Sequence, residues 1–169
     1  MKTVSKFSLV LILAGLTAVG ISSLSQATPT SPQAAANHRL DRLAGAWSAP
    51  GTIQGQPSFP GLITFSVDGS VQGSATPMGA VAPYETPAYG NWVATGHNQA
   101  AYTFVALFAN PDGSLSATTK TVGKLRYDSR ADTWSGPFKF FVLDPEGNEV
   151  VSYPGMIIDA KRIAVETLD

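Results

Sequence analysis

The sequence predicts an all-β protein built as a single antiparallel up-and-down β-barrel of about eight strands, preceded by a short helical turn. Turns that pair an acidic residue with Gly, at Asp68-Gly69, Asp112-Gly113 and Glu146-Gly147, separate runs rich in Val, Ile, Thr, Phe and Tyr. Such pairs tolerate the positive φ of tight hairpins, so the strands that they join run antiparallel side by side. After Ala44 the apolar residues recur with period two, and no window carries a sustained helical stripe.

Residues 1–27 have the pattern of a signal peptide. Lys2 and Lys6 precede an apolar run over 7–16, and Ser25 and Ala27 are the small residues that signal peptidase requires. The uncharged run is short for a membrane span. We therefore expect an exported protein, secreted or periplasmic, without stable membrane insertion after cleavage; an uncleaved N-terminal anchor is the alternative.

The next residues predict a leader and then one domain. Residues 28–36, TPTSPQAAA, carry no charge and no large apolar side chain, so we expect a flexible leader. Residues 37–43 have apolar side chains three apart, with Asn37 as a possible N-cap, and predict a short helical turn. Residues 37–169 then form the β-barrel domain, a length typical of a single domain.

Within the barrel domain, Pro and Gly close each apolar run and so define the expected strands. These strands are Gly45 to Thr52, Gly61 to Val67, Ser70 to Ala75, Tyr89 to Thr95, Ala100 to Ala109, Leu115 to Tyr127, Thr133 to Leu143 and Glu149 to Arg162.

The alternation in the strand from Leu115 to Tyr127 predicts which of its faces is buried. Lys120, Lys124 and Arg126 share one face, which must meet water. The opposite face carries small or mixed side chains, which leave room inside the barrel. These residues are Thr119, Thr121, Gly123, Leu125 and Tyr127.

Composition and charge exclude several classes of partner and site. Removal of Lys2 and Lys6 would leave nine basic against twelve acidic side chains, a formal charge of −3, and no basic cluster remains. We therefore expect no nucleic-acid partner. With no Cys and two His in the chain, we expect neither a disulfide nor a metal site.

No cofactor is expected either, because the chain has no phosphate-binding loop and no dinucleotide fingerprint. A Gly-x-Ser-x-Gly nucleophile motif is also missing. The most obvious carboxylates, Asp68, Asp112, Asp144 and Glu146, fall in turns, where their side chains serve the backbone.

His97 and Tyr102 remain as weak catalytic candidates. His97 precedes the aromatic run that begins at Tyr102, and it could act as a general acid or base at a barrel mouth. The composition of Gly96-His97-Asn98 favours a hairpin turn instead. Tyr84 and Tyr89 flank Glu85 in a loop interrupted by Pro, which is either a packed loop or a lid over one end of the barrel.

Inward aromatic and Thr residues form the candidate ligand-binding set. They either pack as core or line a lipophilic cavity, and the small residues among them favour a cavity. The set is Phe65, Trp92, Tyr102, Phe104, Thr119, Thr121, Tyr127, Phe138 and Phe140.

The segment from Leu43 to Trp47 resembles the lipocalin arrangement. Gly45-Ala46-Trp47 opens the first strand after the helical turn, and Arg162 lies near the end of the last strand. The resemblance implies structural roles for Gly45, Trp47 and Arg162, with the Arg crossing the Trp to close the bottom of the barrel. The family's Thr-Asp-Tyr-type motif and C-terminal helix have no counterpart here, so the resemblance is to calycin-type barrels broadly.

Such barrels generally hold small apolar ligands, and some related barrels act as cofactor-free cyclases or isomerases. The sequence therefore leaves three hypotheses for function. The first is an exported barrel that binds a small apolar or amphipathic molecule. The second is a cofactor-independent cyclase or isomerase that uses the barrel cavity, and the third is a secreted or envelope interaction protein with a filled barrel. The oligomeric state is left open.

Overall fold

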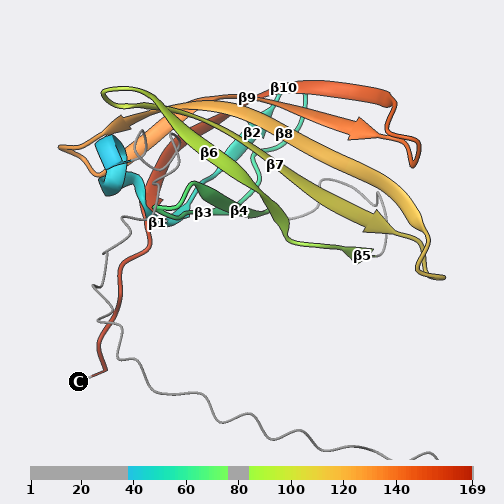
Figure 1. Ribbon diagram of the computed structural model, residues 1–169, viewed down its shortest axis with the longest axis horizontal. Coiled ribbons are helices and arrows are strands. Elements are labelled where there is room, and N and C mark those ends of the chain that lie inside the picture. Colours follow the sequence, from blue (N-terminus) through green and yellow to red (C-terminus); the bar gives the residue numbers. More distant parts are fainter. Residues whose placement is uncertain (1–37, 76–83, 169) are drawn as a thin grey trace, which may run out of the picture.

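The computed structural model describes residues 38–75 and 84–168. The predicted signal peptide, leader and N-cap Asn37 lie outside the described residues. The described part of the chain begins with a 3₁₀ helix, η1 (His38–Leu43), where the sequence predicted a helical turn. Strands make up nearly all of the remaining regular structure, as Figure 1 shows.

The strands of the described part of the chain form one antiparallel sheet in the order β1-β3-β4-β6-β7-β8-β9-β10-β2, with β5 beside β7. Their bounds are β1 (Gly45–Ser48), β2 (Gly51–Ile53), β3 (Gly61–Phe65), β4 (Ser70–Ala75), β5 (Tyr84–Glu85), β6 (Ala88–Gly96), β7 (Gln99–Ala109), β8 (Leu115–Asp128), β9 (Thr133–Leu143) and β10 (Glu149–Arg162).

The sheet closes because β1 pairs with β3 on one side and with β10 on the other. β1 and β2 lie one after the other along β10, as two parts of one interrupted strand. β5 and β6 pair with β7 in the same way. The result is a closed antiparallel barrel of eight strands, so the predicted fold class is confirmed and the architecture is consistent with a calycin-like fold.

The strand predictions are confirmed where the chain has long runs and differ where Pro interrupts it. β9 and β10 have the expected bounds. The strand expected over Gly45 to Thr52 is divided at Ala49 and Pro50, because Pro has no N–H to give to a ladder. β5 was not predicted, since its two residues are too few to show a period.

The acidic-Gly turns are hairpin turns with the predicted backbone. Gly69, Gly113 and Gly147 have φ values of 93°, 85° and 88°. In the first turn the amide of Gly69 donates to the Ser66 carbonyl (3.0 Å), and Asp68 Oδ1 accepts from the backbone amide of Ser70 (2.9 Å). A Gly in the left-handed region after a tight turn is what such a hairpin needs.

Turn carboxylates serve the backbone as predicted, with one difference. Asp112 repeats the pattern of Asp68, with its Oδ1 accepting from the amide of Ser114 (2.9 Å). In the hairpin between β9 and β10, however, Asp144 accepts from the amide of Asn148 (2.7 Å), while Glu146 lies exposed at the tip. The pKa of Asp68 is held below its usual value mainly by the backbone amide of Ser70. The pKa values of Asp112 and Asp144 are lowered mainly by hydrogen bonds from the side chains of Ser114 and Asn148, with their backbone amides adding to the effect.

Alternating side chains of β8 divide the inside of the barrel from the outside, as the sequence predicted. Thr119, Thr121 and Leu125 are buried, whereas Lys124 and Arg126 are exposed. Neighbouring strands alternate in the same way, so one hydrophobic core lies inside the barrel.

Candidate functional site

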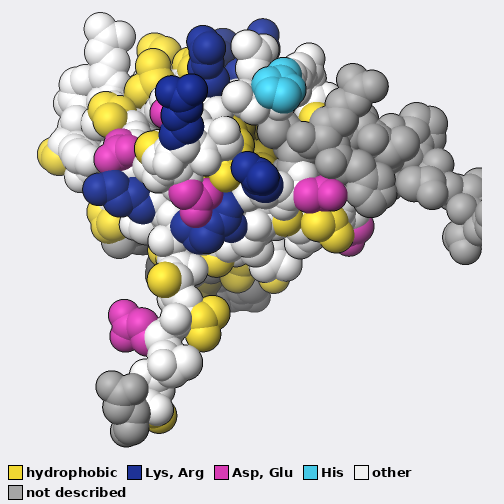
Figure 2. All heavy atoms as spheres, turned by 90° about the vertical axis from the view of Figure 1, so that its left-hand side faces the viewer, with side chains coloured by type: hydrophobic (Ala, Val, Ile, Leu, Met, Phe, Trp, Pro, Cys, Tyr) yellow, Lys and Arg dark blue, Asp and Glu magenta, His cyan; other side chains and the backbone are white. Residues whose placement is uncertain are grey.

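The two halves of the barrel interior differ in how they are filled. In the half next to η1, large side chains pack edge to face: Phe65 contacts both Trp92 (5.7 Å between ring centroids) and Trp134 (5.8 Å). Trp47 and Leu43 are fully buried there. We call this half the closed end. Figure 2 shows the surface of this end, on which acidic and basic side chains are mixed and form no separate patches of one charge.

Arg162 covers the closed end. Its guanidinium lies over the Trp47 ring, with Cζ 4.2 Å from the ring centroid, and the two residues are paired across β1 and β10. The same group donates from Nε to Asp132 Oδ2 (2.7 Å) and from Nη1 to the Ala44 carbonyl (2.8 Å), and from Nη2 to the carbonyl of Arg42.

Asp132 lies in the turn between β8 and β9 and links Arg162 to the end of β8. Its Oδ1 accepts from the Tyr127 hydroxyl (2.8 Å) as well as from Arg162 Nη2 (3.0 Å). The hydrogen bond from Arg162 holds the pKa of the Asp132 carboxyl below its usual value. Three strands, η1 and the residue that follows it therefore meet at one guanidinium.

The other half of the barrel contains a cavity of roughly 380 Å³. Its inner boundary is made by aromatic rings that lie over inward-facing glycines. A Cβ on Gly123 would come within 2.2 Å of the Tyr102 ring, and one on Gly155 would come equally close to the Phe138 ring. These glycines let the rings lie flat against the barrel wall, where they separate the cavity from the closed end.

Strand register arranges the cavity wall in layers. One layer joins Phe104, Thr121, Phe140 and Tyr153 across four neighbouring strands. The next layer lies farther from the closed end and joins Ala106, Thr119, Val142 and Val151. The cavity exists because this second layer holds Ala, Thr and Val, which are too small to fill the barrel.

A few polar groups interrupt this apolar wall. Thr119 and Thr121 are both buried on it. Tyr102 also lines it, and burial raises the pKa of its hydroxyl far above the usual value, so the phenol stays protonated and can act as a hydrogen-bond donor. Glu85 of β5 lines the cavity at the end of the barrel opposite the closed end, which we call the open end. Partial removal of water from its carboxyl there raises the pKa of this group.

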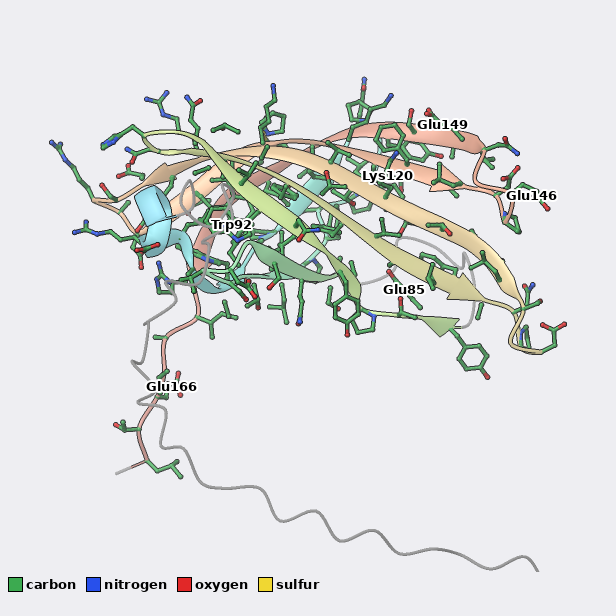
Figure 3. The ribbon with its side chains drawn as sticks, viewed as in Figure 1. Glu85, Trp92, Lys120, Glu146, Glu149 and Glu166 are labelled. Atoms are coloured by element: carbon green, nitrogen blue, oxygen red, sulfur yellow. The ribbon has the colours of Figure 1, made fainter. Side chains whose placement is uncertain are left out.

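The predicted ligand-binding residues divide between the two halves. Those that line the cavity are Tyr102, Phe104, Thr119, Thr121, Phe138 and Phe140. Phe65, Trp92 and Tyr127 belong instead to the packed core cluster, and they do not line the cavity. Figure 3 shows Trp92 and Glu85 in opposite halves of the barrel. The set is therefore divided between core packing and cavity lining, the two alternatives that the sequence left open.

His97 is far from the cavity. It is exposed in the turn between β6 and β7, beyond Trp92 and therefore at the closed end. Its neighbour Asn98 accepts a hydrogen bond from the amide of Tyr127 (2.9 Å). His97 therefore lies in a hairpin turn, the alternative that its composition favoured. It does not line the cavity, where a general acid or base would be needed.

Two residues of the cavity wall, Glu85 and Tyr153, are not in the ligand-binding set predicted from the sequence. The sequence predicted Glu85 to lie in a loop over one end of the barrel. Its inward direction was not predicted, because β5 has only two residues and shows no alternation. Tyr153 could have been found, because alternation along β10 puts it on the same side as the buried Ile157.

Comparisons with protein-family models, with curated proteins and with solved structures find no match to this chain. Among the residues that the structure describes, no group of three or more His, Asp or Glu side chains could hold a metal ion. The described residues also include no helix long and apolar enough to cross a membrane.

Proposed function

We propose that the protein is an exported barrel that binds a small apolar or amphipathic molecule in its half-filled interior. The observation that carries this proposal is the cavity of roughly 380 Å³, walled by aromatic, Ala, Thr and Val side chains and bounded by a packed closed end. Small-molecule sites in proteins are usually concave, mostly apolar and of comparable volume. A filled barrel, the third hypothesis, would need an interior without such a void.

The closed end supports this assignment by giving the cavity a rigid base. Trp47, Phe65 and Trp134 are packed there with almost no exposed surface. A lipocalin-type relationship is part of the proposal, and it is supported by the stacking of Arg162 on Trp47. Export is also part of it, supported by the signal-peptide pattern of residues 1–27. The mass of the protein recovered outside the cytoplasm tests export, because cleavage after Ala27 predicts a defined loss.

Fluorescence titration with the neutral probe N-phenyl-1-naphthylamine tests binding. We expect saturable binding to the folded, lipid-stripped protein. Ala106→Phe places a ring in the cavity, since Ala106 is 3% exposed and lines it, and should weaken probe binding at least tenfold. Ala101→Phe on the same strand is the matched control, because Ala101 has the opposite parity and faces outward. Equal probe binding by both variants would contradict the proposal.

A cofactor-independent cyclase or isomerase is the second candidate function. It is favoured by one observation, the titratable carboxyl of Glu85 on the cavity wall. Tyr102, the catalytic candidate from the sequence, is held protonated by burial and would serve only to donate a hydrogen bond. Mass spectrometry of candidate substrates with and without the protein tests this function, and an unchanged product profile would remove it.

A further inference from the structure

Glu85 carries the only charged side chain among the described residues that line the cavity. The other lining residues there include no Asp, Lys, Arg or His, and most are aliphatic, aromatic or Gly. The Glu85 side chain is exposed to solvent at the edge of the cavity, so its charge stays partly hydrated and is available to the head group of a bound molecule.

Strand pairing turns Glu85 toward the interior. In the β5–β7 ladder Glu85 lies opposite Phe108, and residues directly opposite each other in an antiparallel pair share a face of the sheet. Phe108 is 5% exposed and also lines the cavity, so its face is the inner one. Glu85 is therefore at the open end, where it is reached both by solvent and by a molecule in the cavity.

No partner for Glu85 exists among the described residues. The ion pairs found there join Lys161 to Asp159 and Arg162 to Asp132, and neither involves the cavity. The cavity wall instead offers aromatic rings, among them Phe108 opposite Glu85 and also Phe104 and Tyr153. The faces of aromatic rings attract cations, and a carboxylate attracts them more strongly.

We propose that the ligand is a cationic amphiphile, with an ammonium-type head at Glu85 and an apolar chain in the cavity. The volume limits the size of the chain: at about 30 Å³ for each water-sized group, the cavity holds about a dozen non-hydrogen atoms. A simple alkylamine of medium length has this size and charge. The inference rests on the proposed function, because it assumes that the cavity is a ligand site.

Three matched ligands test the charge of the head group. Decylamine, decanol and decanoate share a chain and differ in charge, and each is titrated at pH 7 as a competitor of N-phenyl-1-naphthylamine. We expect decylamine to bind about tenfold more tightly than decanol, the ratio that one charge-assisted contact of about 1.4 kcal/mol supplies. Decanoate should bind more weakly than decanol, because its charge repels that of Glu85.

Glu85→Gln tests whether this carboxylate is the cause. The variant keeps the size of the side chain and removes its charge, so decylamine should lose about tenfold in affinity while decanol stays within twofold. Glu149→Gln is the matched control, since Glu149 is an exposed acid on β10 that does not line the cavity (Figure 3). It should leave all three ligands unchanged.

The outcomes separate the inference from the proposed function. If the probe binds saturably but the three ligands compete equally, or Glu85→Gln leaves the preference for decylamine intact, the cationic head is overturned while the cavity remains a ligand site. If neither the probe nor any ligand binds to the folded protein, the proposed function fails together with the inference.

Discussion

Arg162 stacks on Trp47 across the pair of strands that closes the barrel, with the guanidinium carbon 4.2 Å from the ring centroid. The first and last strands of the barrel are thereby joined by a side-chain contact as well as by their ladder. Because the guanidinium also binds Asp132 and the backbone after η1, it fixes the geometry of the closed end on which the cavity rests.

Replacement of this guanidinium should therefore destabilise the barrel. Arg162→Lys keeps the charge but loses the planar fork and the flat stacking surface, and we expect the free energy of unfolding in urea to fall by about 2 kcal/mol. Arg126→Lys, at an exposed position on the outer face of β8, is the control and should change it by less than about 0.5 kcal/mol. Equal stability of the two variants would show that Arg162 is only a surface contact.

Gly45 should be intolerant of any side chain, for two reasons. Its φ is 131°, outside the range that L-residues adopt readily, and a Cβ there would come within 2.5 Å of Arg162 Nη1. We expect Gly45→Ala to lower the free energy of unfolding, measured in urea, by more than about 2 kcal/mol.

Gly55→Ala is the control for a positive φ without a clash. Gly55 has a φ of 80°, but a Cβ at this position would meet no atom within 4 Å, so this variant carries only the cost of the backbone conformation. The excess cost at Gly45 measures the clash with Arg162 together with the greater backbone strain at 131°. If the two substitutions cost the same, neither the close approach of Arg162 nor the more extreme φ contributes.

The Asp132–Arg162 contact predicts a specific dependence of stability on pH. The pKa of Asp132 is lowered in the folded protein, so the unfolded chain binds more protons and stability rises with pH. The contribution of Asp132 to the free energy of unfolding is present above the pKa of its carboxyl in the unfolded chain, about 3.9. It is lost as the pH falls through the lower pKa of the folded protein.

Asp132→Asn isolates this contribution from those of the turn aspartates, whose pKa values are also lowered. Asn tolerates the φ of 49° at this position, so the backbone is preserved. We expect the variant to lose stability at pH 7 and to approach the wild-type free energy of unfolding near about pH 2, measured by urea unfolding at each pH. Parallel curves for the two proteins would refute the linkage.

Local patterns in the sequence were sufficient to predict most of the strands, the hairpins and the side of the sheet on which each residue lies. Tyr102 and Phe65 both point inward, as alternation requires. Alternation does not specify the height of a residue along the barrel axis, because height depends on the register between strands that are distant in sequence. For this reason Phe65, Trp92 and Tyr127 could not be distinguished from Phe104 and Phe140 before the pairing was known.

The same limit explains why Glu85 was not predicted to line the cavity. Its inward direction comes from pairing with Phe108, a residue distant in the sequence, and its own strand has only two residues. Gly45, Trp47 and Arg162 were easier to select, because their spacing resembles that of a known arrangement.

In the proposed function a ligand enters the barrel rather than adhering to its outer surface, where Val105, Leu107 and Val122 are exposed. Methyl NMR during a titration with decanol distinguishes these two modes of binding. We expect saturable shifts confined to inward methyl groups such as those of Ala106, Thr119 and Thr121. Shifts confined to the outer methyl groups of Val105, Leu107 and Val122, or no shifts at all, would contradict the proposed function.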